Sequence, residues 1–207
     1  DAFPYDSASS IFAESNCTYT SDPIRERLAP FCASTCDNGS NECFLSKAEL
    51  KRAVDNYRTQ DCANLPDCDV GQIYGWPMNA WCVSNVTDMS WLFYSMPYFN
   101  ENISSWDVSN VVNMDYMFYY AQAFNDDLSG WDVSNVVNMD YMFYYAQAFN
   151  GDLSGWNVSG VSYMAGMFLY AKSFNQNLCS WGDAFPYDSA SSIFAESNCT
   201  YTSDPIR

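Results

Sequence analysis

Residues 106–130 read WDVSNVVNMDYMFYYAQAFNDDLSG, and residues 131–155 repeat them as WDVSNVVNMDYMFYYAQAFNGDLSG, with Gly151 in place of Asp126. The pattern extends in both directions, because tryptophan recurs every 25 residues, at Trp81, Trp106, Trp131, Trp156 and Trp181. A fixed period of this length is typical of stacked repeats, in which one repeat cannot bury its apolar side chains alone. The sequence therefore predicts that residues one period apart lie directly above one another.

Each repeat is predicted to consist of a short strand, a corner and a short helix. Trp131 and Val133 alternate with polar neighbours, which favours a strand with one buried face. Asn135 shares its position with Gly160, so we expect a corner with a positive φ angle there. The following apolar residues have helical spacing and predict a helix over 137–146: Val136, Met139, Met142, Phe143 and Ala146.

These features predict an α/β solenoid with one parallel strand and one short helix in each 25-residue turn. Strands stack at about 4.8 Å and helices at about 8–10 Å, so unequal spacing on the two sides should curve the array, with a sheet on the inner face. Columns of methionine and phenylalanine are expected to form the core. A polar column is interpreted as a hydrogen-bonded ladder: Asn100, Asn125, Asn150 and Asn175.

A cap is expected before the first repeat, because an open end would expose core and strand edges. Ser46 and Glu49 form the start signal of a helix. The apolar side of this helix is formed by Leu50, Val54 and Tyr57. We predict a disulfide-rich, helical N-terminal cap over 32–80, with a helix over 47–58, followed by four repeats over 81–180.

The same 25 residues, DAFPYDSASSIFAESNCTYTSDPIR, begin at residues 1 and 183, an offset of 182. We interpret this copy as evidence for a tandem array of 182-residue modules; the alternative is a terminal duplication in a single-module protein. In the array, residues 1–31 are a closing cap that belongs to a preceding module. Residues 181–207 are the C-terminal cap and the start of the next module, with a last short helix over 189–196.

Composition restricts the partners of the chain. It has 25 acidic and 8 basic side chains, no histidine and a net charge of −17, which disfavours nucleic acid and anionic membranes. No apolar run is long enough for a membrane span. Nine cysteines without histidine and without a CxxC pair favour disulfides over zinc, and therefore an extracellular or cell-surface location.

Six Asn-x-Ser/Thr sequons agree with secretion and predict N-linked glycans. The predicted sites are Asn16, Asn38, Asn102, Asn157 and Asn198, whereas Asn85 is less suited because it occupies the corner position.

One 182-residue period contains eight cysteines, an even number that allows every thiol to pair. We predict a Cys179–Cys199 bridge across the last turn, and by translation Cys17 pairs with a cysteine outside this chain. The cysteines of the N-terminal cap are expected to pair among themselves, in a connectivity that their spacing leaves open: Cys32, Cys36, Cys43, Cys62, Cys68 and Cys82.

The repeated string W-x-V-S-N-V-x-x-M-x-x-M-F-x-x-A-x-x-F-N-x-[DN]-[IL]-S over residues 81–181 resembles the BspA-like leucine-rich-repeat family of surface proteins, in particular the secreted versions of bacteria and microalgae. The lead-in FLSKAELKRAVDNY also looks like the amino-terminal flank of that family. The resemblance implies a leucine-rich-repeat-like fold, a role in adhesion or assembly at the cell surface, and no catalytic residues. The many cysteines and the 182-residue period depart from the bacterial pattern.

Few residues suggest a chemical site. We find no motif of an enzyme or of cofactor binding and expect neither a catalytic activity nor a cofactor. The polar corner of Asn125, Asp126, Asp127 and Asp152 is a candidate Ca²⁺ site, for which the alternative is a solvated corner. Tyrosine columns are candidates for surface contacts, unless their rings only cover one another: Tyr94, Tyr119 and Tyr144, and Tyr116 with Tyr141.

The leading hypothesis is an extracellular structural or adhesive repeat protein, in which modules join end to end into a filament or stalk. Its partners are then copies of itself, with N-linked glycans on its surface and Ca²⁺ as a further candidate. The alternative is a monomeric cell-surface binding module that recognises a glycan or a protein through its concave sheet or its tyrosine columns.

Overall fold

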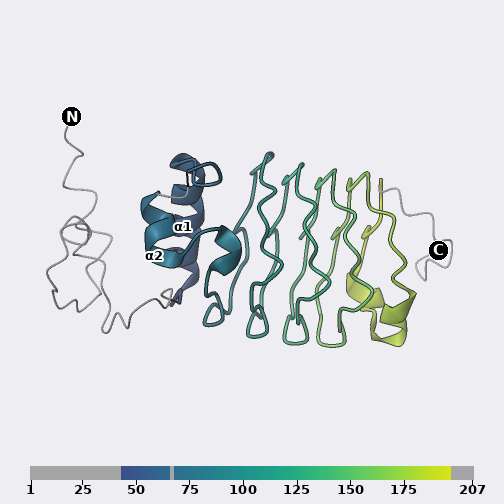
Figure 1. Cartoon of the computed structure of the whole chain (residues 1–207). Coiled ribbons are helices and arrows are strands. Elements are labelled where there is room, and N and C mark those ends of the chain that lie inside the picture. Colours follow the sequence, from purple (N-terminus) through teal and green to yellow (C-terminus); the bar gives the residue numbers. More distant parts are fainter. Residues whose placement is uncertain (1–42, 66–67, 197–207) are drawn as a thin grey trace, which may run out of the picture. The chain divides into compact units, whose positions relative to one another are not determined.

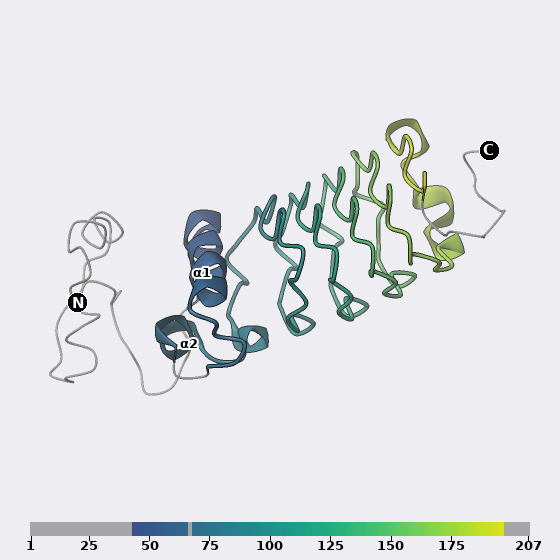
Figure 2. The same cartoon turned by 90° about the horizontal axis from the view of Figure 1, so that it is seen from above.

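The computed structural model describes residues 43–65 and 68–196, and the structural statements below concern these residues. The chain separates into two units, of which the second, Asn41–Arg207, contains all of them. The helices are α1 (Lys47–Thr59), α2 (Asp69–Tyr74) and the short 3-10 helices η3 (Met78–Ala80), η4 (Cys179–Ala184) and η5 (Tyr187–Ser189) (Figure 1). Between η3 and η4, the repeats lie side by side as loops that follow one another in chain order (Figure 2). The predicted closing cap over residues 1–31 lies outside the described residues.

The N-terminal cap contains α1, which forms where the sequence predicts a helix over 47–58. The Ser46 side chain accepts a hydrogen bond from the Glu49 N–H, which satisfies one of the N–H groups that a helix start leaves open. The Glu49 carboxylate in turn accepts from the Leu45 N–H at 2.8 Å. The buried side of α1 consists of Leu50, Ala53, Val54 and Tyr57.

Two disulfides hold the cap together. Cys43–Cys82 joins the residues before α1 to the first repeat, and the Phe44 N–H donates to the Cys82 carbonyl at 2.9 Å. Cys62–Cys68 links the segments at the end of α1 and the start of α2. Phe44 is 0% exposed and its ring lies 5.3 Å from the ring of Trp81. The cap therefore covers the apolar end of the first repeat.

The predicted α/β solenoid of leucine-rich-repeat type is wrong, because the repeats contain neither the strand nor the helix on which it depends. In the described residues no strand forms, and the sheet-like pairing is limited to isolated parallel bridges: Cys43↔Cys82, Asp88↔Asn113, Asn113↔Asn138 and Asn138↔Tyr163. Residues 81–178 also contain no helix. The concave inner sheet that the sequence predicts is therefore absent from the part of the chain that the structure describes.

The helix over 137–146 fails to form because its N–H groups are shared with the next repeat. The Phe143 N–H donates to the Met167 carbonyl at 2.9 Å, whereas the Tyr144 N–H donates only three residues back, to the Tyr141 carbonyl, at 3.1 Å. The residues before and after them continue this alternation. In an α-helix, each N–H group bonds to the carbonyl four residues back along the same chain. Here alternate N–H groups bond to the next repeat and the others bond three residues back, so the segment consists of successive turns.

Left-handed residues produce these turns. Tyr141 and Tyr145 have φ angles of 54° and 57°. The equivalent positions of the other repeats are also left-handed: Trp91, Ser95, Tyr116, Tyr120, Gly166 and Tyr170. A left-handed residue interrupts a helix and costs about 1–3 kcal/mol when it carries a side chain. The bonds between repeats and the ring contacts described below offset this cost.

The left-handed corner that the sequence predicts at Asn135 is not found there. Instead, the Asn135 side chain donates to the Ser109 carbonyl of the preceding repeat at 2.7 Å. Asn135 therefore contributes a side-chain donor at this position. The left-handed residues lie elsewhere in the repeat, at positions such as Tyr141 and Tyr145.

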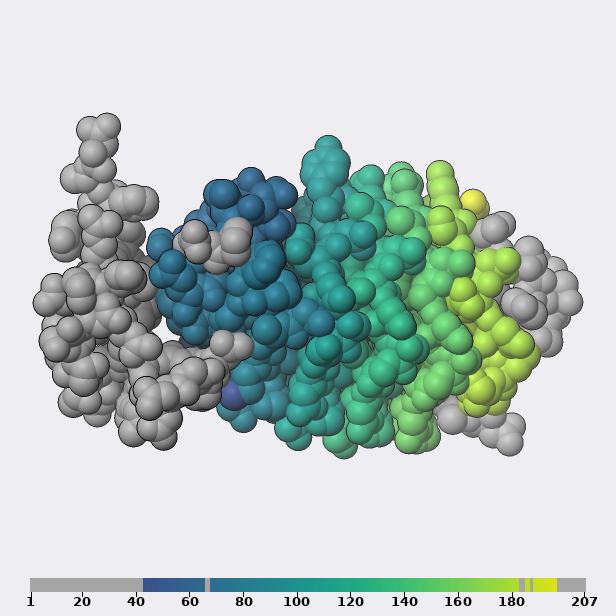
Figure 3. Space-filling model, viewed as in Figure 1, coloured from purple at the N-terminus to yellow at the C-terminus, as the bar shows by residue number. Residues whose placement is uncertain are grey.

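Like residues lie on like residues through the core, as the sequence predicts. The Phe143 ring is 5.3 Å from the Phe118 ring and 5.7 Å from the Phe168 ring, and all three are 0% exposed. Spacings near 5 Å exclude helices on either side, because packed helices lie about 8–10 Å apart. The buried methionine columns contain Met89, Met114, Met139 and Met164, and Met117, Met142 and Met167. In the space-filling view, each repeat forms a narrow band across the molecule (Figure 3).

Polar ladders complete the contacts between repeats. The Asn125 Oδ1 atom accepts from the Asn150 N–H at 2.8 Å, and Asn100 and Asn150 make the same bond to the next repeat. The predicted asparagine ladder is confirmed. The Trp156 indole N–H donates to the Leu128 carbonyl at 3.0 Å, a bond between repeats that replaces the strand pairing expected at this tryptophan.

The last described segment continues the ladder in a shifted register. The Phe168 N–H donates to the Ile193 carbonyl at 2.9 Å, an offset one residue longer than that between Phe143 and Met167. The predicted helix over 189–196 is wrong, because residues 191–196 form turns like those of the repeats. Across the described residues, no helix is long and apolar enough to cross a membrane.

Candidate functional site

A band of aromatic residues runs across the repeats on the side of the left-handed turns. We define this tyrosine band as Trp91, Tyr94, Tyr116, Tyr119, Tyr120, Tyr141, Tyr144 and Tyr145. Trp91 and Tyr94 are 42% and 38% exposed, and the other members are half-buried. The band contains all five tyrosines that the sequence proposes for surface contacts.

The rings of the band stack on one another along the repeats. Tyr119 and Tyr144 lie 4.5 Å apart with an angle of 8° between their planes. Tyr120 and Tyr145 lie 4.6 Å apart at 16°. Tyr116 and Tyr141, at 5.1 Å and 28°, are less parallel. The sequence left two interpretations open: rings that contact a partner, and rings that only cover one another. The structure is compatible with both, because the rings are part-exposed and also cover their neighbours.

This stacking decides what the band can offer to a partner. A sugar or a cation binds an aromatic residue over the face of the ring. The faces of Tyr119 are occupied by Tyr94 on one side, at 5.0 Å, and by Tyr144 on the other. At Tyr119 the band therefore presents a ring edge to solvent rather than a free face.

Burial also keeps the Tyr119 and Tyr144 phenols uncharged. It raises the pKa of Tyr119, and the neighbouring Tyr120 raises that pKa further. Burial raises the pKa of Tyr144 in the same way. Phenols with a pKa above the ordinary value of about 10 stay protonated at neutral pH.

Two carboxylates lie beside the band. Burial raises the pKa of Asp140, although its Oδ1 atom accepts a bond from the Ala165 N–H at 2.6 Å. The equivalent Oδ1 atom of Asp115 is buried without a hydrogen-bond partner among the described residues. The difference arises from the residue at position 163. In the preceding repeat, the Asn138 side chain accepts a hydrogen bond from the Asp140 N–H. Tyr163 occupies the corresponding position and has no such acceptor, so the Ala165 N–H donates to Asp140 instead. No ligand set follows from two carboxylates alone.

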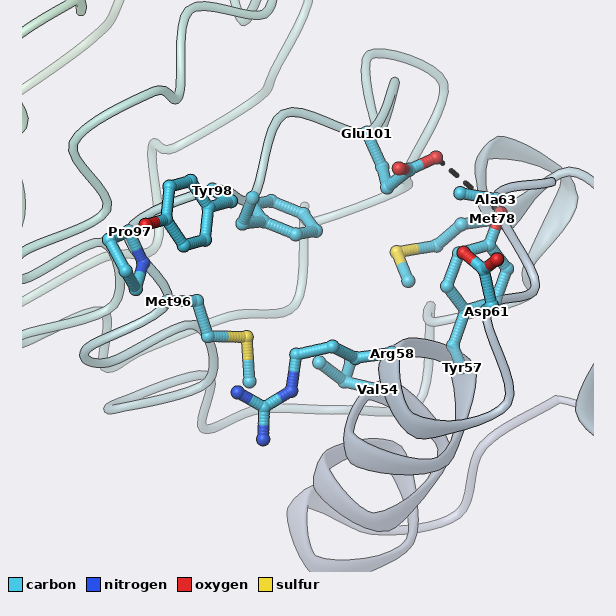
Figure 4. Close-up of a pocket in the computed structure, with 11 residues that line it drawn as sticks. Val54, Tyr57, Arg58, Asp61, Ala63, Met78, Met96, Pro97, Tyr98 and Glu101 are labelled. Atoms are coloured by element: carbon cyan, nitrogen blue, oxygen red, sulfur yellow. Dashed lines mark hydrogen bonds between the residues drawn. The ribbon is translucent and has the colours of Figure 1, made fainter.

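A hollow of about 210 Å³ lies between the end of α1 and the first repeats (Figure 4). Its wall is lined by Val54, Tyr57, Arg58, Asp61, Ala63, Met78, Met96, Pro97, Tyr98, Phe99 and Glu101. Most of these side chains are apolar, and Arg58 reaches toward Met96 across the hollow (Figure 4). The size corresponds to a small molecule or a few side chains rather than to a deep active site.

The polar groups of the hollow are coupled. The Tyr57 hydroxyl donates to the Glu101 carboxylate at 3.5 Å. Burial, together with the charge of Glu101, raises the pKa of Tyr57 to about 12. Burial likewise raises the pKa of Glu101, and the hydrogen bond from Tyr57 opposes that rise.

Sequence reasoning missed this hollow, because α1 and the first repeat are brought together only by folding. One signal was present. Tyr98 occupies a position that is Ala123, Ala148 and Ser173 in the later repeats, and its side chain is 92% exposed. An aromatic residue at a position of small residues marks a local departure from the repeat.

At the candidate Ca²⁺ corner, each side chain already accepts a hydrogen bond. The Asn125 oxygen accepts from Asn150, the Asp126 Oδ2 atom accepts from the Ile103 N–H at 2.7 Å, and Asp127 and Asp152 accept from the N–H groups two residues ahead. Hydrogen bonds from Ser129 lower the pKa of Asp127. In residues 43–65 and 68–196, no group of three or more acidic, cysteine or histidine side chains could hold a metal ion.

The predicted modification sites divide between described and undescribed residues. Asn85, Asn102 and Asn157 are all exposed, so the structure does not set Asn85 apart. Asn16, Asn38 and Asn198 lie outside the described residues. The same holds for Cys17, Cys32, Cys36 and Cys199, and therefore for the predicted Cys179–Cys199 bridge. The other four cysteines of the cap form the two bridges described above.

Comparison with known proteins adds a family. The sequence pattern of the family described as "Mycoplasma protein of unknown function, DUF285" matches residues 68–181, more than half of the chain. No curated protein and no solved structure matches the chain. The matched residues include α2, η3 and all the repeats, but not α1.

Proposed function

The chain belongs to the DUF285 family, whose function is unknown, and from this premise we propose that it is an extracellular structural repeat protein. Its modules join end to end, and its stacked repeats keep them at a fixed distance. One observation carries the proposal: contacts between repeats continue without a gap from the first repeat to the last described segment.

Four kinds of contact join each repeat to the next. Backbone bonds, such as that from Phe118 to Met142 at 2.9 Å, are made at alternate residues of the turns. Asparagine side chains and tryptophan indoles add bonds at two further corners. Buried rings fill the space between them. Because these contacts are distributed around the whole repeat, bending at one junction would break several of them together, which favours stiffness.

The chemistry of the repeats also favours a spacer over a catalyst. Residues 106–130 and 131–155 differ at one position, so neighbouring repeats offer the same groups twice. A catalytic site needs a few unlike groups with tuned pKa values at one place. A spacer gains from repetition, because each copy adds length without a new kind of contact.

The proposed location and assembly rest on the sequence together with the disulfides. Disulfides persist outside the cytosol, and two are present in the described residues. The identical segments at 1–25 and 183–207 support a tandem array with a period of 182 residues. The resemblance of the repeat motif to BspA-like surface proteins also supports an extracellular location, although the leucine-rich-repeat fold is absent from the described residues.

The proposal can be tested with two 182-residue periods joined through their shared segment and expressed as one chain. Small-angle scattering and negative-stain microscopy should show a particle of about twice the length and the same cross-section. The matched control joins the periods through a Gly/Ser linker, which should give a broad distribution of angles. If the native junction bends as freely as the linker, or folds back into a compact particle, the spacer function is rejected.

Binding of a ligand is a second candidate, favoured by the hollow beside α1 and by the exposed Tyr98 at its rim. This proposal uses a different surface from the concave sheet, which is absent from the described residues. Binding of small glycans or peptides followed by titration calorimetry, with Tyr98→Ala and Arg58→Ala as variants, tests it. Binding that both substitutions leave unchanged would place the ligand elsewhere.

A further inference from the structure

We propose that the tyrosine band is a site of oxidative cross-linking, in which Tyr119 couples to Tyr144 and Tyr120 to Tyr145 through carbon–carbon bonds between their rings. The oxidant is hydrogen peroxide acting through a peroxidase. The product is a dityrosine staple between two neighbouring repeats of the same chain. This inference goes beyond the proposed spacer function and does not depend on it.

The geometry brings the reacting rings together before any oxidation. The ring centroids of Tyr119 and Tyr144 are 4.5 Å apart at 8°, and those of Tyr120 and Tyr145 are 4.6 Å apart at 16°. Radical coupling needs two ring carbons to meet, and this is usually limited by diffusion of two separate radicals. Here the second ring is already in contact, so the entropy of bringing the partners together has been lost on folding.

The chemistry balances with one peroxide per link. Each phenol loses one electron and one proton, and hydrogen peroxide accepts both pairs and becomes two water molecules. The two phenoxyl radicals join through the carbons ortho to their oxygens. Each of these carbons then loses its hydrogen, which returns to the phenolic oxygen, so both hydroxyl groups are restored. The Tyr119 and Tyr144 phenols start protonated, because burial raises their pKa values.

Burial disfavours competing oxidation of the methionines, whereas Trp91, at 42% exposed, is a competing site. Met117 and Met142, the sulfur-containing side chains nearest in sequence, are 0% exposed, so an enzyme-sized oxidant does not reach them. The tyrosines of the band are half-buried and therefore reachable at their edges. Tyr98 is the contrasting case, because it is 92% exposed. Exposure alone would make Tyr98 the main reacting residue, whereas prior contact selects the band.

Cross-linking would fix the register of two repeats covalently. Tyr119 and Tyr144 are 25 residues apart, so each link closes a loop of one repeat. A covalent bridge across such a loop restricts the unfolded chain in the way a disulfide does. Unlike a disulfide, the carbon–carbon bond is not cleaved by thiols.

The amino-acid sequence allows a direct assay on the full chain. A protease that cleaves before aspartate releases residues 115–125 and residues 140–151, each with three tyrosines. The two peptides differ by Gly151, so mass spectrometry distinguishes them. After dilute protein is treated with a peroxidase and hydrogen peroxide, we expect these two peptides to be joined with the loss of two hydrogen atoms. Fragmentation should locate the links at Tyr119–Tyr144 and Tyr120–Tyr145.

Two variants separate contact from exposure. Tyr119→Phe with Tyr120→Phe retains the rings but removes the O–H groups that are oxidised, so the Tyr119–Tyr144 and Tyr120–Tyr145 links should be lost. Fragmentation distinguishes this loss from any link between Tyr116 and Tyr141, whose rings stack at 5.1 Å. Tyr98→Phe should leave the two expected links unchanged. A circular-dichroism spectrum equal to that of the parent protein verifies the fold of each variant. Protein whose cysteines have been reduced and alkylated, and which is freed of thiol before oxidation in urea, should also lose the link, because the rings are no longer in contact.

The proposal is overturned if no link forms between residues 115–125 and 140–151, or if links are confined to Tyr98 or oxidation to Trp91. It is also overturned if the Tyr119→Phe/Tyr120→Phe variant or the unfolded protein gives the same yield. None of these results would affect the particle-length experiment, so the failure of cross-linking can be distinguished from the failure of the spacer function.

Discussion

Truncation of Phe143 tests whether the ring columns hold the repeats together. Phe143 is 0% exposed and contacts Phe118 at 5.3 Å, Phe149 at 4.0 Å and Phe168 at 5.7 Å. Replacing a buried phenylalanine with alanine costs about 3–5 kcal/mol through lost transfer energy and the cavity that remains. Three ring pairs are lost, each worth about 0.5–1.5 kcal/mol beyond its buried area. We therefore expect Phe143→Ala to lower the free energy of unfolding by the upper end of the range, about 5 kcal/mol.

The matched control is Phe194→Ala at the end of the same column. Phe194 is half-buried, and its ring lies 5.7 Å from the Phe168 ring and 6.4 Å from the Phe174 ring. Because the half-buried Phe194 side chain buries less apolar area than Phe143, we expect Phe194→Ala to lower the free energy of unfolding by about 1–2 kcal/mol. Urea unfolding followed by tryptophan fluorescence gives both values.

Hydrogen exchange of backbone amides shows which repeats Phe143→Ala destabilises. The Phe118 and Phe143 N–H groups bond to Met142 and Met167, so both should exchange faster in Phe143→Ala. If Phe143→Ala costs no more than Phe194→Ala, or if exchange changes in one repeat alone, the columns do not couple neighbouring repeats and our reasoning is refuted.

Three further predictions follow from particular contacts. Gly166→Ala should destabilise the protein by about 1–2 kcal/mol, because Gly166 has φ +57° and an added Cβ would lie 2.5 Å from the Tyr141 ring. In the same urea assay, Gly130→Ala should be close to neutral, because its Cβ would meet nothing within 4 Å. Replacing Cys43 and Cys82 with serine should cost about 4 kcal/mol and replacing Cys62 and Cys68 about 2 kcal/mol, because the bridges span 39 and 6 residues; equal losses of thermal stability would contradict this account. Burial raises the pKa of Asp88, but hydrogen bonds from Ser90 and Lys47 outweigh it and leave the pKa below its ordinary value. The stabilisation is thus present above the unfolded pKa and is lost as the pH falls through the lower folded value. Lys47→Met should therefore cost at most about 1 kcal/mol at neutral pH and reduce the acid sensitivity of unfolding, and an unchanged pH profile would count against the pair.

The sequence was informative about which side chains lie on one another, because that follows from the 25-residue period. The 25-residue interval predicts that Phe118, Phe143 and Phe168 form one column, and their rings do stack. The asparagine ladder follows from the same interval. The start of α1 could be predicted from Ser46, because a helix cap is a local interaction.

The local conformation inside a repeat was predicted wrongly. Val136, Met139, Met142, Phe143 and Ala146 have the spacing of a helix side, but successive turns of three residues give nearly the same spacing. The pattern of apolar residues reports which side chains are buried and cannot distinguish these two backbones. Tyr141 and Tyr145 are left-handed, which their residue type does not suggest.

Among candidate sites, the sequence identified the tyrosines of the band but not how they lie. Whether Tyr119 offers its face or its edge depends on the rings above and below it. The hollow beside α1 could not be predicted from the sequence, because Tyr57 and Glu101 come from separate parts of the chain.

By itself, then, the sequence determined the register, because identical side chains at a fixed interval gain most when each lies on its own copy. Only the tertiary structure decided the backbone of the repeat. The N–H groups of residues such as Phe143 could bond along the chain or to the next repeat, and the choice depends on a neighbour about 5 Å away, which no local pattern reveals.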